Sequence, residues 1–193
     1  MPWLGHYFRD GGYETAYIGK WHCMTGSDRR GFEDYLIRIG SYDTDVGAED
    51  QNDWLRYSLA QGYEMSKGKQ NGADHKLKDL NYGVSLYSER DFPATYAFRK
   101  AIDFVQQKHE KPFILFLSET SPHQPFAPPE PYDEMYDASE IVLSENVEHY
   151  ASPKRFIELR GHPATFRQYR EASRDQLKSA WAHYLGMVTH LDN

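Results

Sequence analysis

The feature that most constrains the fold is an unbroken apolar run, FILFLS, at residues 113–118. Such a run is typical of a strand that is covered on both faces, as in a parallel sheet. The segment before it repeats apolar residues at helical spacing from Tyr96 to Val105, and Pro112 is expected to end that helix. A helix that leads directly into a buried strand predicts an α/β protein with a mostly parallel sheet.

A second strand is predicted over residues 13–19, YETAYIG, after a short helix over residues 2–11. It delivers Lys20 and His22 just beyond its last residue. In α/β sheets the loops that follow the carboxyl ends of strands are where ligands collect. The segment is therefore a candidate functional site.

A third basic group, His123, lies in the proline-punctuated loop that follows residues 113–118. If the two strands are neighbours in one parallel sheet, we expect Lys20, His22 and His123 to converge on one crevice. A lysine ammonium and two imidazoles suit a compact tetrahedral anion, and a histidine can also pass a proton to a leaving alkoxide. Five other histidines match no tight metal motif and are predicted to be structural or exposed: His75, His109, His149, His162 and His183.

The rest of the chain carries weaker signals. Residues 31–92 are expected to form a long, locally structured insertion, and residues 130–163 a polar surface stretch. Residues 164–191 repeat apolar positions at helical spacing and predict a strong terminal helix. We expect a single domain or part of one from a chain of 193 residues.

Composition excludes several classes of function. A net charge of -7, with 22 Lys+Arg against 29 Asp+Glu, argues against a nucleic-acid partner. No apolar run is long enough to span a bilayer, and no signal-peptide core follows Met1. Aromatic residues make up 15% of the chain, which fits a pocketed enzyme or a carbohydrate-facing surface.

Three blocks, in this order, resemble the sulfatases of the alkaline-phosphatase-like superfamily: DGGYETAYIGKWH, KPFILFLSETSPHQPF and YLGMVTHLDN. The resemblance implies a three-layer sandwich, with a mostly parallel central sheet and helices on both faces. It also implies that residues 1–193 are part of a sulfatase catalytic domain, with a variable insertion at about residues 31–92.

The resemblance also assigns roles. It implies that Lys20 and His22 contact the sulfate and the hydrated formylglycine nucleophile, and that His123 binds sulfate beside the leaving group. It implies Ca²⁺ and formylglycine as cofactors, with the calcium ligands and the formylglycine outside this chain, and a small-molecule or carbohydrate sulfate ester as substrate. Cys23 lacks the proline and arginine of the family's Cys/Ser-x-Pro-x-Arg block, so it is not the nucleophile. A periplasmic, secreted or lysosomal location follows from resemblance alone.

Two alternatives stay open. A phosphonate or phosphate monoester hydrolase of the same superfamily would use the same tetrahedral anion site. A non-catalytic anion- or glycan-binding module would keep the basic crevice without turnover. Because no nucleophile block is present in it, the chain by itself is expected to be inactive.

Overall fold

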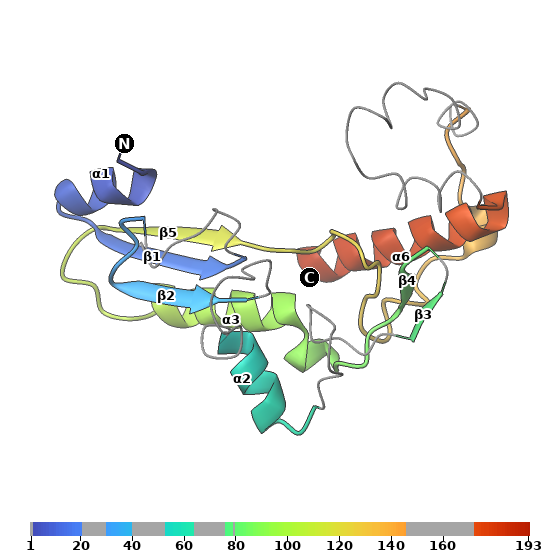
Figure 1. Ribbon diagram of the computed structural model, residues 1–193, viewed down its shortest axis with the longest axis horizontal. Coiled ribbons are helices and arrows are strands. Elements are labelled where there is room, and N and C mark those ends of the chain that lie inside the picture. The colour runs from blue at the N-terminus through green and yellow to red at the C-terminus, as the bar shows by residue number, and fades with distance from the viewer. Residues whose placement is uncertain (1, 21–29, 40–52, 64–75, 79, 146–171) are drawn as a thin grey trace. The chain divides into compact units, whose positions relative to one another are not determined.

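The computed structural model describes residues 2–20, 30–39, 53–63, 76–78, 80–145 and 172–193 (Figure 1). The chain divides into two compact units, of which the first comprises residues 1–74 and 87–120 and the second residues 75–86 and 121–193. Each unit has its own sheet and its own buried apolar residues.

The first unit is built on a three-stranded parallel sheet with the order β2-β1-β5. Its strands are β1 (Glu14–Gly19), β2 (Tyr35–Arg38) and β5 (Phe113–Ser118). This sheet confirms the predicted α/β class and both predicted strands. Strand β2 falls within the segment for which the sequence indicated only an insertion, so part of that segment belongs to the sheet.

Helices pack on both faces of this sheet, namely α1 (Leu4–Asp10) on one face and α3 (Pro93–Val105) on the other (Figure 1). Phe104 of α3 packs against Tyr35, with ring centroids 5.2 Å apart. On the opposite face, Tyr17 packs against Phe32 at 5.4 Å. Gly5 of α1 lies so close to that loop that an added Cβ would be 3.0 Å from the Phe32 ring. The result is the expected layering of helix, sheet and helix.

Strand β5 is less covered than its apolar sequence indicated. Phe113 is 36% exposed and Phe116 is 44% exposed. The reason is topological, because β5 lies at the edge of the sheet and pairs only with β1 among the described strands. An apolar strand thus stays partly open to solvent in the described part of the chain.

Helix α3 ends at Val105 and not at Pro112, so that boundary was predicted wrongly. At this earlier end the Phe104 carbonyl has two other partners, the amide of Gln107 at 3.1 Å and the ring of His109. Its Nε2 lies 2.8 Å from the carbonyl oxygen of Phe104, which a continuing helix would use for its own backbone bond. Its Nδ1 lies 2.8 Å from a carboxylate oxygen of Glu14, so His109 ties the helix end to the start of β1.

A polar network joins α2 (Asp53–Ala60) to the 3-10 turn η1 (Glu89–Asp91) that precedes α3. The indole nitrogen of Trp54 donates to the carbonyl oxygen of Asp91 at 3.0 Å. The Asp91 carboxylate accepts from the hydroxyls of Tyr57 at 2.5 Å, Tyr63 at 2.9 Å and Ser88 at 3.0 Å. Burial alone would raise the pKa of Asp91, but these hydrogen bonds outweigh it and lower that pKa.

The second unit contains an antiparallel pair, β3 (Lys76–Lys78) and β4 (Tyr82–Val84), together with the 3-10 turn η2 (Ala138–Glu140) and the helix α6 (Arg174–Asp192). Leu80 and Tyr82 pack with Ala180 of α6. The amide of Gly83 donates to the carbonyl of Phe126 at 3.0 Å, which ties the proline-rich segment to β4.

Helix α6 begins at Arg174, whereas the apolar spacing predicted a helix from residue 164; residues 164–171 lie outside the described residues. Ser173 is its N-cap: the Ser173 hydroxyl accepts from the amide of Gln176 at 3.2 Å, and the Gln176 side chain accepts from the amide of Ser173 at 2.8 Å. This capping box fixes the start, and Ala172 is not helical. No helix within the described ranges combines the length and the apolar character needed to cross a membrane.

Candidate functional site

The carboxyl end of β1 is shaped by a glycine that no other residue can replace without strain. Gly19 has a φ of +117°, and an added Cβ would lie 1.9 Å from the carbonyl oxygen of Ser118. Directly after it, the amide of Lys20 donates to that same carbonyl at 2.7 Å. The carboxyl ends of β1 and β5 therefore lie side by side, and half-buried Lys20 stands at this edge.

Two further hydrogen bonds hold the same turn. The amide of Ile39, just beyond β2, donates to the carbonyl of Gly19 at 3.0 Å. The hydroxyl of Tyr17 donates to the carbonyl of Lys20. The peptide groups on both sides of Lys20 are thus held by groups from all three strands or their ends.

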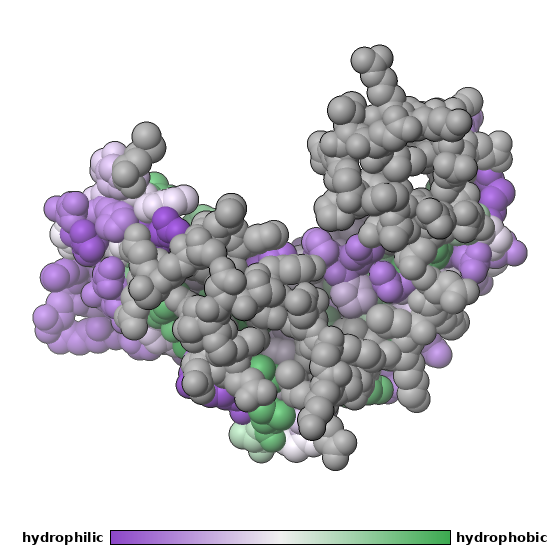
Figure 2. All heavy atoms as spheres, viewed as in Figure 1, coloured by the Kyte–Doolittle hydropathy of each residue, from purple (hydrophilic) through white to green (hydrophobic). Residues whose placement is uncertain are grey.

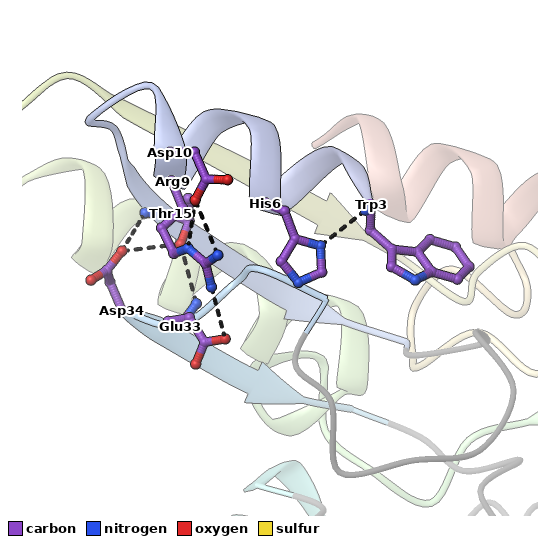
Figure 3. Close-up of polar contacts among 7 residues, drawn as sticks. All are labelled: Trp3, His6, Arg9, Asp10, Thr15, Glu33 and Asp34. Atoms are coloured by element: carbon purple, nitrogen blue, oxygen red, sulfur yellow. Dashed lines mark hydrogen bonds and ion pairs between the residues drawn. The ribbon is translucent and has the colours of Figure 1, made fainter. Parts of the chain in front are cut away.

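The amino end of β1 is held by a separate polar cluster, drawn in Figure 3. The amide and hydroxyl of Thr15 both donate to one carboxylate oxygen of Asp34, at 2.7 and 3.0 Å, and the amide of Glu33 donates to the Thr15 hydroxyl at 3.1 Å. Thr15 is fully buried. Its part in the GYETA block is therefore to anchor the connection into β2, a role that the sequence pattern did not reveal.

The amino end of the sheet is also a charged surface. Figure 2 shows hydrophilic atoms gathered over this end of the first unit, near the end of α1 and the connection from α3 to β5. The connection of residues 106–112 contains exposed Lys108, Glu110 and Lys111. Solvated charges of this kind are ordinary surface, so the chemistry is to be sought at the opposite, carboxyl end.

His123 is an exposed residue of the second unit. Its Nδ1 lies 2.6 Å from the carbonyl oxygen of Gln124. A carbonyl oxygen can only accept, so Nδ1 carries a proton and the lone pair of the neutral ring is on Nε2. When the ring is protonated, Nε2 becomes the nitrogen that can deliver a proton to a substrate oxygen.

The predicted site residues are distributed as follows. Lys20 lies in the first unit and His123 in the second, while His22 and Cys23 lie outside the described residues. The convergence of the three basic groups therefore stays a prediction.

Two of the other histidines take structural roles. His109 links α3 to β1, and the Nδ1 of His183 lies 2.8 Å from the carbonyl of Ser179 within α6. His75, His149 and His162 lie outside the described residues.

Within the described ranges, no three His, Cys, Asp or Glu side chains gather in a way that could hold a metal ion. The described residues thus do not fit a calcium site.

Comparisons with known proteins identify one family that this chain resembles. A family model described as Sulfatase matches residues 1–193. An uncharacterized sulfatase, YidJ, of Escherichia coli (strain K12) is 32% identical over 69% of this chain and 25% of its own length. An arylsulfatase of Clostridium perfringens (strain 13 / Type A) is 28% identical over 96% of this chain and 40% of its own length.

Solved structures show the same fold. The phosphonate monoester hydrolase of Agrobacterium radiobacter matches 98% of this chain and 41% of its own with a TM-score of 0.60 at 16% identity. The phosphonate monoester hydrolase SpPMH of Silicibacter pomeroyi matches 97% and 41%, also with a TM-score of 0.60, at 18% identity. The chain thus spans between a quarter and about two fifths of the length of these four relatives.

Proposed function

This chain belongs to the sulfatase family, and from that premise we propose that the protein containing it hydrolyses sulfate esters, with Lys20, His22 and His123 in the anion site. The observation that carries the proposal is the position of Lys20 at the carboxyl end of the sheet. The amide of Lys20 donates a hydrogen bond to the carbonyl of Ser118, and Ser118 is the last residue of β5, after which the loop with His123 begins.

Chain connectivity supports the grouping. His22 follows Lys20 by two residues, and His123 follows Ser118 by five. At up to about 3.6 Å per residue, the backbone keeps His123 within roughly 18 Å of Ser118. This bound allows His123 to reach the edge that holds Lys20.

Each basic group has a task in sulfate-ester cleavage. Lys20 supplies a fixed positive charge for the sulfate oxygens, and His22 a hydrogen-bond donor beside it. His123 donates a proton through Nε2 to the departing oxygen, on which negative charge develops. Charge partners placed where charge develops stabilise the transition state more than the bound ester.

Sulfate-ester cleavage in this family also needs a metal ion and an attacking group. The sulfatase family generally uses a metal ion, and the resemblance adds a formylglycine, which supplies the attacking oxygen when present. We infer that the calcium ligands lie outside residues 1–193, and that the formylglycine does too. The substrate is then a small-molecule or carbohydrate sulfate ester.

A phosphonate or phosphate monoester hydrolase is the second candidate, since both solved structures described above are phosphonate monoester hydrolases. Their low identity supports the fold alone, whereas both curated relatives carry sulfatase names at 28 and 32% identity. Hydrolysis of sulfate esters is therefore the first candidate function. A non-catalytic anion- or glycan-binding module would bind sulfate but turn over neither ester.

The test is a parallel assay of the natural full-length protein with 4-nitrophenyl sulfate and 4-nitrophenyl phenylphosphonate. We expect a higher kcat/KM for the sulfate. A higher kcat/KM for the phosphonate would establish the second candidate instead, and binding of sulfate without turnover of either ester would establish the binding module.

Single substitutions test which side chains contribute to turnover. Lys20→Ala and His123→Ala should each lower kcat/KM about a hundredfold or more, as loss of a transition-state charge partner does. Lys111→Ala is the matched lysine control, because Lys111 is exposed at the amino end of the same sheet. Cys23→Ser should leave activity nearly unchanged, and an inactive Cys23→Ser enzyme would contradict the exclusion of that thiol.

A further inference from the structure

Tyr17 combines a buried ring with a hydroxyl that reaches the candidate site. It lies on β1 and has Leu36 of β2 and Phe116 of β5 as register partners. Its ring stacks on Phe116, with centroids 5.3 Å and planes 8° apart, and meets Phe32 edge-on at 5.4 Å. The residue is only 6% exposed. Packing on both sides therefore fixes where the hydroxyl points.

That hydroxyl donates to the carbonyl oxygen of Lys20, beyond the end of the strand. Two other bonds hold the same turn, from the Lys20 amide to Ser118 and from the Ile39 amide to Gly19. Those two join backbone groups and use no side-chain atom. The bond to the Lys20 carbonyl is the one of these three that depends on a particular side chain.

The geometry points to Tyr17 as a positioning residue of the candidate site. Its hydroxyl fixes the carbonyl of Lys20, and with it the orientation of the peptide group that follows Lys20. This role in turnover rests on the proposed function, because orientation of Lys20 affects rate only if Lys20 contacts the anion. Small displacements of a charge partner lower the rate, since transition-state stabilisation depends on geometry.

A purely structural role for the hydroxyl makes a different prediction. Phenylalanine would fill the space between Phe32 and Phe116 equally well, so only one hydrogen bond would be lost. Stability would then fall modestly, while the orientation of Lys20 and the rate of a folded enzyme would not change. The two roles are separated by a measurement at Lys20 itself and by the split between kcat and KM.

The first measurement does not depend on activity. In the natural full-length protein, Tyr17→Phe should speed hydrogen exchange at the amides of Lys20 and Ile39 by about fivefold or more, because local opening of this turn becomes easier. Tyr13→Phe is the matched control. Tyr13 precedes the same strand, is 37% exposed and packs edge-on against Phe8, so its loss of a hydroxyl should leave both amides unchanged.

The second measurement is kinetic, with 4-nitrophenyl sulfate as the probe. Tyr17→Phe should lower kcat about tenfold with KM changed less than about twofold, because positioning is felt mainly in the transition state. In a Lys20→Ala background the same substitution should have almost no further effect, since the group being positioned is gone. Replacement of Tyr17 by 4-aminophenylalanine keeps a donor on the ring and should restore most of the rate.

The outcomes are distinguishable. Unchanged exchange at Lys20 and Ile39, or a kcat equal to that of Tyr13→Phe, overturns the inference. A wild-type protein that turns over neither ester, but shows the faster exchange in Tyr17→Phe, overturns the proposed function and supports the placement of Lys20 by Tyr17. If Tyr17→Phe is too unstable to measure, 4-aminophenylalanine compared with 4-methylphenylalanine gives the same test at matched volume.

Discussion

Gly19 is the residue on which the geometry of the candidate site most directly depends. Gly19→Ala combines a left-handed φ with a Cβ placed 1.9 Å from the Ser118 oxygen. We expect a loss of about 3 kcal/mol or more in the free energy of unfolding, because strain and steric overlap add. Chemical denaturation monitored by circular dichroism is the measurement.

Gly12 gives the matched control for that substitution. It also has a positive φ, +86°, but an added Cβ would meet nothing within 4 Å. Gly12→Ala should therefore cost only about 1 kcal/mol, the cost of the backbone conformation alone. Equal losses at both positions would contradict the close approach of β1 to Ser118.

At the same scale, the candidate residues could be predicted from the sequence and stay a prediction, whereas their supporting contacts could not be predicted at all. Lys20 and His123 follow from their places after two strands and from the resemblance of the surrounding blocks. Thr15 and Tyr17 lie in the same block and looked like ordinary strand residues. Their hydroxyls reach Asp34 and the Lys20 carbonyl, and such partners depend on the tertiary fold.

Among the elements, α2 and η1 are joined by the Asp91 carboxylate. Asp91→Ala removes three hydrogen bonds from hydroxyl donors, and we expect it to lower the free energy of unfolding by about 2 kcal/mol. Asp103→Ala on α3 serves as control. Asp103 is 59% exposed and lies 3.7 Å from Lys100, so its loss should cost within about 0.5 kcal/mol. Thermal unfolding of both variants is the measurement. Similar losses in the free energy of unfolding would contradict a bridging role for Asp91.

The link between α3 and β1 should depend on pH. Both ring nitrogens of His109 face acceptors, the Glu14 carboxylate and the Phe104 carbonyl. The hydrogen bond to Glu14 is the main cause that raises the pKa of His109 above 6.5. A folded-state pKa above the unfolded value gives stability that is fully present below about pH 6.5 and is lost as pH rises through the raised pKa.

The measurement is the difference in melting temperature between the wild type and His109→Gln from about pH 5 to pH 9. The wild type should gain most at the acidic end, and Glu14→Gln should abolish that gain because it removes the carboxylate. A difference that stays constant over this range would show that the ion pair with Glu14 contributes nothing.

Element boundaries show what sequence periodicity can and cannot give. Apolar spacing found the helices that became α3 and α6, because tertiary burial imposes that spacing. It misplaced the end of α3 and the start of α6, since these depend on the His109 side chain and on the Ser173 cap. Strand β2 is only four residues long and was missed, because so short a stretch gives too little periodicity.

At the scale of the whole molecule, residues 1–193 by themselves should hydrolyse neither sulfate nor phosphate esters. The chain provides basic groups that can bind the anion, but it has no match to the Cys/Ser-x-Pro-x-Arg block that carries the nucleophile in sulfatases. Electrostatic stabilisation of a transition state has no effect without an attacking group. The assay uses 4-nitrophenyl sulfate with and without calcium. Saturable turnover that His22→Ala abolishes would contradict this expectation.

The same polypeptide should also self-associate through the partly open strand β5. An exposed apolar edge strand is a site for pairing with another chain. Phe116→Lys should reduce association measured by sedimentation velocity, because a charge on an edge opposes pairing. Tyr7→Lys, at a 65% exposed position of α1, should not. Equal sedimentation of both variants would show that β5 is not the contact.

The bond between Trp54 and Asp91 has an optical consequence. Trp54 is 2% exposed, whereas Trp3 and Trp181 are 43 and 49% exposed. In a Trp21→Phe variant, which removes the fourth tryptophan of the chain, acrylamide should therefore quench Trp3 and Trp181 first and leave Trp54 to emit at the short-wavelength end of the spectrum. That residual emission would report the opening of the contact between α2 and η1 in real time, without any attached dye.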